Sequence, residues 1–167
     1  MYNPPTRLDY LRRSVKADSH PVRTVPKFAP SHKQRIVQDL KRLGVSHSGL
    51  QTMEAHYLPQ VIHADEQIGG VVYGMHRDGF AMLIATDRRV IYLDKKPMFT
   101  NEEEITYFVV SGVILSHAGP GTTVTLHTKV KDFKIKTLNL HCAEGFVEYI
   151  ESRSLELKKE EDKRSRQ

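Results

Sequence analysis

The stretch GFAMLIATDRRVIYLDKKP, residues 79–97, constrains the fold more than any other part of the chain. Two short apolar runs, residues 81–85 and 90–93, flank the polar tetrapeptide TDRR. Apolar runs of this length, bounded by turn residues, are typical of buried strands. Aspartate suits the corner because its carboxylate can accept hydrogen bonds from backbone amides just ahead of it. The stretch therefore predicts a hairpin with strands over residues 80–86 and 89–93.

Five more short segments indicate strands around this hairpin. Side chains alternate between apolar and polar in residues 123–128 and 132–137, as expected for half-buried strands. Three consecutive glutamates, Glu102–Glu104, discourage pairing with another sheet and mark their strand as an edge. The strand predicted after it, residues 109–117, is apolar on both faces. The predicted additional strands are 68–73, 100–106, 109–117, 123–128 and 132–137.

The last part of the chain changes to helical spacing. Apolar residues at helical intervals predict one long helix over residues 143–159, with Phe146 and Ile150 packed against the strands. Ahead of the strands, Ser31 and Ser46 can cap two further helices. These helices are expected at 32–43, with the apolar stripe 36–43, and from Ser46 to about residue 57.

Charge is concentrated at the N-terminus. The whole chain has a net charge of +5, residues 1–30 have +4, and residues 31–150 have equal numbers of acidic and basic side chains. A nucleic-acid-binding domain normally has a basic face, so the neutral body disfavours nucleic acid as a partner. Any electrostatic partner is expected to meet the arm, whose basic residues include Arg7, Arg12, Arg13 and Lys16. Residues 8–16 fit either a short docking helix or a solvated terminus.

The length of 167 residues suits about one domain. The organisation we predict is a basic arm (1–30), a helical extension (31–59), the strand-rich domain (60–160) and a polar tail (161–167). No run approaches the ~20 apolar residues of a spanning helix, and the start has no apolar core of a signal peptide. A single cysteine, Cys142, suits a reducing compartment. We therefore expect a cytoplasmic protein, with the inner membrane surface as a peripheral alternative.

Four segments resemble a known family. DEQIGGVVYG (65–74), LIATDRRVIYLDKKP (83–97), TYFVVSGV (106–113) and GFVEYIESR (145–153) are similar to bacterial pleckstrin-homology (PH) domains of the YokE-like type. The resemblance covers residues 58–153. It implies an α+β, mainly β fold: a PH-like, seven-stranded, partly open barrel of two near-orthogonal antiparallel sheets, capped by a C-terminal helix. It also implies a non-enzymatic binding or assembly module without a cofactor, in a group where some members form oligomers.

The resemblance also implies a candidate anion or lipid site. Eukaryotic relatives often bind phosphoinositides through basic loops after strands one, three and six. Carried over to this chain, those loops hold Arg77, Lys95, Lys96, Lys129 and Lys131. They also hold three aspartates, which leaves a net charge of +2. The alternative is that these residues are ordinary solvated turns.

The residues do not indicate catalysis or metal binding. Nine histidines are present, but none follows the repeated short ligand step of structural zinc sites. His141 and Cys142 are adjacent, which does not by itself orient a thiolate–imidazole pair. Nucleophile elbows, Walker loops and dinucleotide fingerprints are lacking. The sequence therefore predicts no enzyme activity, metal, cofactor or small-molecule substrate.

Three functions follow from these observations. The leading hypothesis is protein binding or self-association, through strand edges or through the helix face 36–43. The second is peripheral attachment to anionic membrane through the basic arm and the barrel loops. The third and weakest is nonspecific contact of the arm with nucleic acid.

Overall fold

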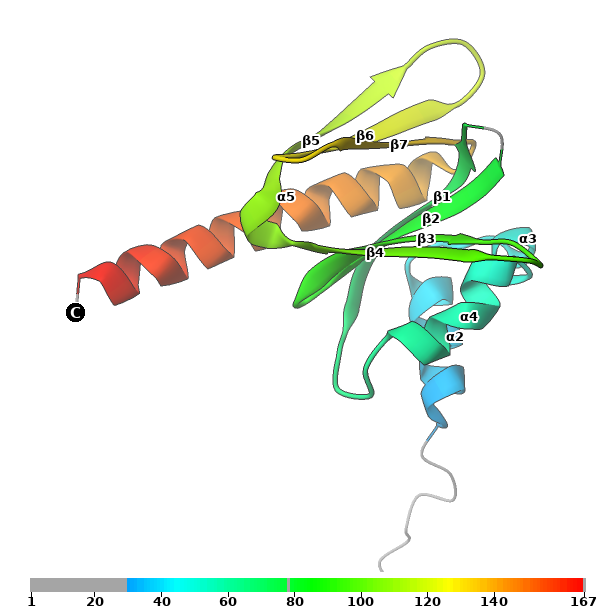
Figure 1. Ribbon diagram of the computed structural model, residues 1–167, viewed down its shortest axis with the longest axis horizontal. Coiled ribbons are helices and arrows are strands. Elements are labelled where there is room, and N and C mark those ends of the chain that lie inside the picture. The colour runs from blue at the N-terminus through cyan, green and yellow to red at the C-terminus, as the bar shows by residue number, and fades with distance from the viewer. Residues whose placement is uncertain (1–29, 78, 167) are drawn as a thin grey trace, which may run out of the picture.

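The computed structural model describes residues 30–77 and 79–166 (Figure 1). Seven antiparallel strands form one sheet in the order β4-β3-β2-β1-β7-β6-β5. This confirms the predicted seven-stranded, mainly β fold with a C-terminal helix. The strands are β1 (Ile68–His76), β2 (Gly79–Thr86), β3 (Arg89–Lys95), β4 (Thr100–Thr106), β5 (Val110–His117), β6 (Thr122–Thr128) and β7 (Asp132–Thr137).

The sheet bends between β1 and β7. These two strands share one aligned residue pair, Met75 with Lys136, whereas β1 and β2 pair over their whole length. The bend separates a half made of β4–β1 from a half made of β7–β5. Figure 1 shows the helix α5 (Leu140–Ser165) lying between the two halves. The helix therefore fills the opening of the partly open barrel.

The predicted hairpin is present as β2 and β3. Leu83 pairs with Tyr92 and Ile84 with Ile91, and the turn falls at Asp87 and Arg88. Both strands are buried on both faces. Leu83 belongs to the core under α5, while Ile84 belongs to a second core on the opposite face. This double burial explains why the hairpin shows continuous apolar runs instead of alternation.

The second core is covered by the N-terminal helices α2 (His32–Arg42), α3 (His47–Leu50) and α4 (Met53–Val61). Ile36 and Leu40 of α2 are completely buried in this core. The prediction that the 36–43 helix face contacts another chain is therefore wrong. That face already packs on the sheet of its own chain, in the same core as Ile84 and Ile91.

The second predicted helix is two helices. Thr52 interrupts it, because its hydroxyl accepts a hydrogen bond from the Ala55 amide and so starts α4 afresh. Met53, at the first position of α4, is 47% exposed. Helix α4 also continues through Pro59 to Val61, whereas the predicted helix ends at about residue 57.

Helix α5 is longer at both ends than the apolar spacing predicts. The Asn139 side chain caps it by accepting a hydrogen bond from the Cys142 amide, so the helix begins at Leu140. It ends at Ser165, and its final turns project from the body (Figure 1). These turns are charged and largely exposed, so the apolar pattern used for the prediction does not reach them.

Two residues fix α5 on the sheet. Phe146 and Ile150 are 0% and 1% exposed and pack among side chains of both sheet halves. Gly70 of β1 allows this close approach, because a Cβ atom there would lie 3.2 Å from the Cα of Phe146. The helix backbone therefore rests almost directly on β1.

We expect Phe146→Ala to lower the free energy of unfolding by roughly 3–5 kcal/mol, because truncation of a buried aromatic leaves a cavity. Leu155→Ala, on the exposed part of the same helix, should change it by less than about 0.5 kcal/mol. Urea denaturation followed by circular dichroism measures both. Equal stability of Phe146→Ala and wild type would contradict the packing of α5.

Candidate functional site

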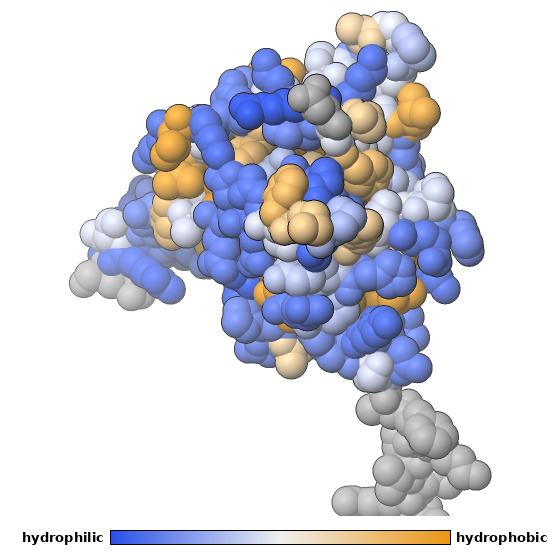
Figure 2. Space-filling model, turned by 45° about the vertical axis from the view of Figure 1, so that its right-hand side comes forward, coloured by the Kyte–Doolittle hydropathy of each residue, from blue (hydrophilic) through white to orange (hydrophobic). Residues whose placement is uncertain are grey.

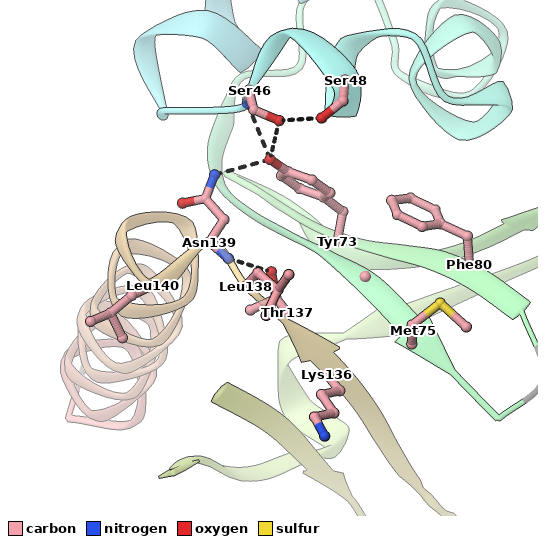
Figure 3. A pocket seen from close by; sticks show the side chains of 11 residues that line it. Ser46, Ser48, Tyr73, Met75, Phe80, Lys136, Thr137, Leu138, Asn139 and Leu140 are labelled. Carbon is pink, nitrogen blue, oxygen red and sulfur yellow. Dashed lines mark hydrogen bonds between the residues drawn. The ribbon is translucent and has the colours of Figure 1, made fainter. Parts of the chain in front are cut away.

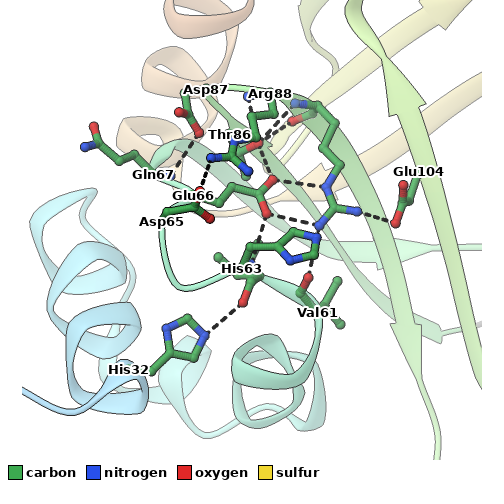
Figure 4. A network of polar contacts seen from close by, with 12 residues as sticks. His32, Val61, His63, Asp65, Glu66, Gln67, Thr86, Asp87, Arg88 and Glu104 are labelled. Atoms are coloured by element: carbon green, nitrogen blue, oxygen red, sulfur yellow. Dashed lines mark hydrogen bonds and ion pairs between the residues drawn. The ribbon is translucent and has the colours of Figure 1, made fainter.

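The most extensive polar cluster surrounds the β2–β3 turn (Figure 4). Glu66, in the connection between α4 and β1, is 0% exposed and accepts hydrogen bonds from Arg89 Nε and Nη2 at 3.0 Å each. Its Oε1 also accepts a hydrogen bond from the Thr86 hydroxyl at 2.7 Å. Arg89 reaches further, to the Val61 carbonyl and to the Glu104 carboxylate on β4. One arginine thus joins α4, the connection, β3 and β4.

Other residues of the turn bind two more elements. The Asp87 carboxylate accepts a hydrogen bond from the Gln67 backbone amide. The Asp87 backbone carbonyl accepts one from Arg153 Nε of α5. The Thr86 backbone carbonyl accepts a hydrogen bond from the Tyr107 hydroxyl at 2.5 Å. Tyr107 begins the short 3-10 helix η1 (Tyr107–Val109) between β4 and β5. The TDRR tetrapeptide therefore makes contacts well beyond its own hairpin.

The polar cluster around Glu66 stabilises the fold, and its protonation properties do not suit proton transfer. Burial raises the pKa of Glu66, but the hydrogen bonds from Arg89 and Thr86 outweigh it and bring the pKa down from 4.5 to about 2. A carboxylate with that pKa is ionised throughout the neutral range, so it is a poor general acid or base there. Both of its oxygens are already hydrogen-bonded.

The only cysteine is also engaged in structure. Cys142 is buried, and its thiol donates a hydrogen bond to the Leu43 carbonyl at 3.4 Å. Burial raises the pKa of this thiol to about 11, so the reactive thiolate is scarce at neutral pH. The neighbouring His141 is exposed and packs beside Gly44.

The predicted anion-site residues lie in three loops, and two of them are held by acidic partners. Lys131 Nζ is 2.7 Å from the Glu103 carboxylate. Lys96 Nζ is 2.6 Å from Asp94 and also donates to the Phe80 carbonyl. These contacts neutralise charge that an anionic ligand would need.

The remaining predicted residues do not converge. Lys95 lies over the Tyr57 ring of α4, and Lys129 is exposed in the β6–β7 loop. Arg77 and Lys131 line a common hollow of about 80 Å³, and the acidic residues Glu103 and Asp132 line it too. The five residues therefore form no shared basic pocket. The arm residues Arg7, Arg12, Arg13 and Lys16 lie outside the described residues.

A groove that the sequence did not reveal lies where the helical layer stops (Figure 3). It has a volume of about 550 Å³. Tyr73 and Phe80 form its floor with ring centroids 5.9 Å apart. Its other apolar lining residues are Met75, Leu138 and Leu140, which are 53%, 86% and 43% exposed.

A basic hollow of about 380 Å³ adjoins the groove. Arg77, Lys134 and Lys136 line it, and Asp132 is the acidic residue among its lining side chains. Lys134 and Lys136 form no ion pair with any of the described residues. The alternation of lysines in β7 was the available signal, but nothing in the sequence placed β7 beside the end of β1.

Among the described residues, the face of the molecule in Figure 2 has no large apolar patch. Figure 2 shows a largely hydrophilic face on which hydrophobic side chains form small, separate patches. Within residues 30–77 and 79–166, no three His, Cys, Asp or Glu side chains gather where they could hold a metal ion. None of the helices in that part of the chain is long and apolar enough to cross a bilayer.

A family model described as "Bacterial PH domain" matches residues 62–152, which is more than half of the chain. The match begins at the end of α4 and ends inside α5, so it spans all seven strands. No curated protein sequence is significantly similar to this chain.

Two solved structures are similar to part of this chain at low sequence identity. One is a DUF1696 family protein with a pleckstrin-homology domain from Shewanella loihica, at 15% identity and a TM-score of 0.45. That comparison covers 60% of this chain and 89% of the other. The other structure contains the linker and DH/PH domains of p115-RhoGEF, at 11% identity and a TM-score of 0.37, covering 72% of this chain and 41% of that one.

We expect acid to weaken the fold through Glu66. Because its folded pKa is below its unfolded value, its contribution to stability is present above pH 4.5 and is lost as pH falls toward about 2. At neutral pH, Glu66→Gln should cost roughly 3–5 kcal/mol, since Arg89 is left without its buried partner.

Denaturant titrations between pH 7 and pH 2 measure both effects. Glu66→Gln should show less loss of stability across that acidic window than wild type. The control is Asp65→Asn, which removes the neighbouring exposed carboxylate. Its hydrogen bond from Arg88 also lowers the pKa of Asp65, but solvent screens this exposed pair, so the pH dependence should change much less than in Glu66→Gln. A Glu66→Gln profile parallel to that of wild type would show that Glu66 does not titrate in this window.

Proposed function

Because the chain belongs to the bacterial PH domain family, we propose that it is a non-enzymatic interaction module of the cytosol that associates with a second copy of itself. Domains of this fold often mediate protein or lipid interactions. A shared fold does not select between the two. The choice depends on which surfaces of this chain are available. The YokE-like subtype stays a prediction.

The observation that supports self-association is the contrast between the two edges of the sheet. Edge strand β4 carries Glu102, Glu103 and Glu104, and two such edges would repel each other. Edge strand β5, with the sequence VSGVILSH, contains no proline and no Lys, Arg, Asp or Glu. Because β5 is an edge strand that pairs with β6 on one side, the backbone amides and carbonyls of its other side can pair with another strand.

The β5 edge is also suited to pairing with its own copy. The pairing of β5 with β6 is irregular between Val110 and Gly112 and regular from Gly112 to His117. This regular part carries Val113 and Leu115, which are half-buried, and Ile114, which is 52% exposed. Antiparallel pairing of two such edges about a twofold axis would bring neutral, β-branched and aliphatic side chains together.

Membrane attachment through the loops has less support. Lys96 and Lys131 are paired with Asp94 and Glu103, and the five predicted loop residues do not share one pocket. The arm retains its net charge of +4 over residues 1–30. Any attraction to anionic lipid is therefore assigned to the arm.

Self-association is tested by sedimentation velocity over a range of micromolar concentrations. We expect a mass above the 19.1 kDa of one chain, rising with concentration. Ile114→Lys should weaken association by roughly tenfold or more, because a lysine on an edge strand opposes strand addition. Leu155→Lys, a change of the same kind at a similar exposure on α5, should have no effect. A mass of 19.1 kDa at every concentration would refute self-association.

Membrane attachment is tested by co-sedimentation with vesicles of phosphatidylcholine and phosphatidylglycerol. We expect the full chain to bind weakly at low salt and to be released at high salt, as for binding by charge alone. Deletion of residues 1–30 should abolish this binding. Retained binding after the deletion would assign the interaction to Arg77, Lys95, Lys96, Lys129 and Lys131 instead.

A further inference from the structure

The apolar groove and the basic hollow form one continuous surface. Met75 and Lys136 line both of them, and these two residues are the aligned pair that joins β1 to β7. The groove lies on the side of the sheet covered by α2–α4, just beyond Ser46 and Ser48 of the α3 turn. We call the combined surface the β1–β7 surface.

The groove is suited to an apolar side chain. Its polar floor atoms are already satisfied, since the Tyr73 hydroxyl donates to Ser46 Oγ at 3.0 Å and accepts from Asn139 Nδ2 at 2.9 Å. The Tyr73 hydroxyl also accepts a hydrogen bond from the Ser46 backbone amide at 3.1 Å (Figure 3). An occupant therefore gains by covering Phe80, Met75 and Leu138 and not by supplying hydrogen bonds. The volume of about 550 Å³ is within the range of ligand-sized pockets.

The hollow beside it is suited to carboxylates. Lys134 and Lys136 point to the exposed face of β7, while Phe133 and Ile135 are buried on the other face. His76 Nδ1 lies 2.7 Å from the Lys134 carbonyl, which ties the end of β1 to β7 and holds Arg77 nearby. Among the described lining residues the acidic one is Asp132, and its carboxylate is 2.9 Å from His127 Nδ1.

The charge and shape of the β1–β7 surface indicate which kind of ligand it binds. The arm of this chain has a net charge of +4 over residues 1–30, which opposes its binding beside three basic residues. The apolar part of the surface is concave, which suits an inserted side chain better than a flat bilayer. Acidic residues beside an apolar anchor satisfy both halves of the surface.

We propose that the β1–β7 surface binds an extended acidic segment of a partner protein, with one apolar side chain in the groove and adjacent carboxylates on Arg77, Lys134 and Lys136. This site is separate from the β5 edge and does not depend on self-association. The apolar anchor provides affinity, and the carboxylates set orientation and specificity.

The test is selection of a random twelve-residue peptide display library, of the kind used for linear motifs, on the full-length chain. We expect enriched peptides to combine an aliphatic or aromatic residue with two or more nearby Asp or Glu. A fluorescent copy of the most enriched peptide is then titrated against variants. The double variant Lys134→Glu, Lys136→Glu and the single variant Leu138→Asp should each weaken binding by roughly tenfold or more.

The matched control is Lys158→Glu with Lys159→Glu, which makes the same charge change on the exposed part of α5 and should leave binding unchanged. All variants replace exposed side chains, and thermal melts verify their folding. The Ile114→Lys chain should bind the peptide as wild type does, which separates this site from the proposed self-association.

Three results would overturn the proposal. The first is no enrichment, or enriched peptides without acidic residues. The second is peptide binding that the Lys134→Glu, Lys136→Glu chain retains. The third is a rise in peptide affinity of roughly tenfold on deletion of residues 1–29, which would make the chain's own arm the occupant. Vesicle binding lost in the double variant, without any peptide selected, would assign the surface to anionic membrane.

Discussion

The ion pair between Glu66 and Arg89 is the contact on which the arrangement of the chain depends. Glu66 is completely buried between the helical layer and the hairpin, and Arg89 reaches from it to Glu104 on the edge strand β4. Thr86 and Asp87 extend the same cluster to Tyr107 and to α5. Three of the four polar residues that interrupt the hairpin's apolar sequence, Thr86, Asp87 and Arg89, thus link the helical layer to β4, to Tyr107 and to α5. An unpaired charge at this depth would be costly, so the cluster favours one arrangement of the layers.

This arrangement decides which surfaces remain for partners. The faces of β1, β2 and β3 are covered by α2–α4 on one side, and by α5 together with the β5–β7 half of the sheet on the other. Within the part of the chain that the structure describes, the pair of sheet edges, the outer face of β7 and the groove at the end of the helical layer stay accessible. One edge is acidic and the other is neutral, while the β7 face is basic. The two proposals assign the neutral edge to self-association and the basic face to an acidic partner.

The sequence predicted the strands and the C-terminal helix because their apolar patterns are local. It also predicted the acidic edge, since Glu102–Glu104 need no tertiary context. It left open whether Ile36 and Leu40 are internal, because an amphipathic helix looks the same whether its stripe covers its own sheet or another chain. Nor did it predict the groove, which combines β1, β2, the α3 turn and the start of α5. Such a site depends on the β1–β7 pairing and on the bend of the sheet, which a one-dimensional pattern does not contain.

We proposed that the neutral edge of the sheet is the surface by which this PH domain associates with its own copy. Hydrogen–deuterium exchange at a low and a high protein concentration tests it most directly. Amides of β5, residues 110–117, should exchange more slowly at the high concentration, while the exchange of those of β4, residues 100–106, should not change. Exchange in β5 that is independent of concentration, or slowing confined to β4, would contradict it.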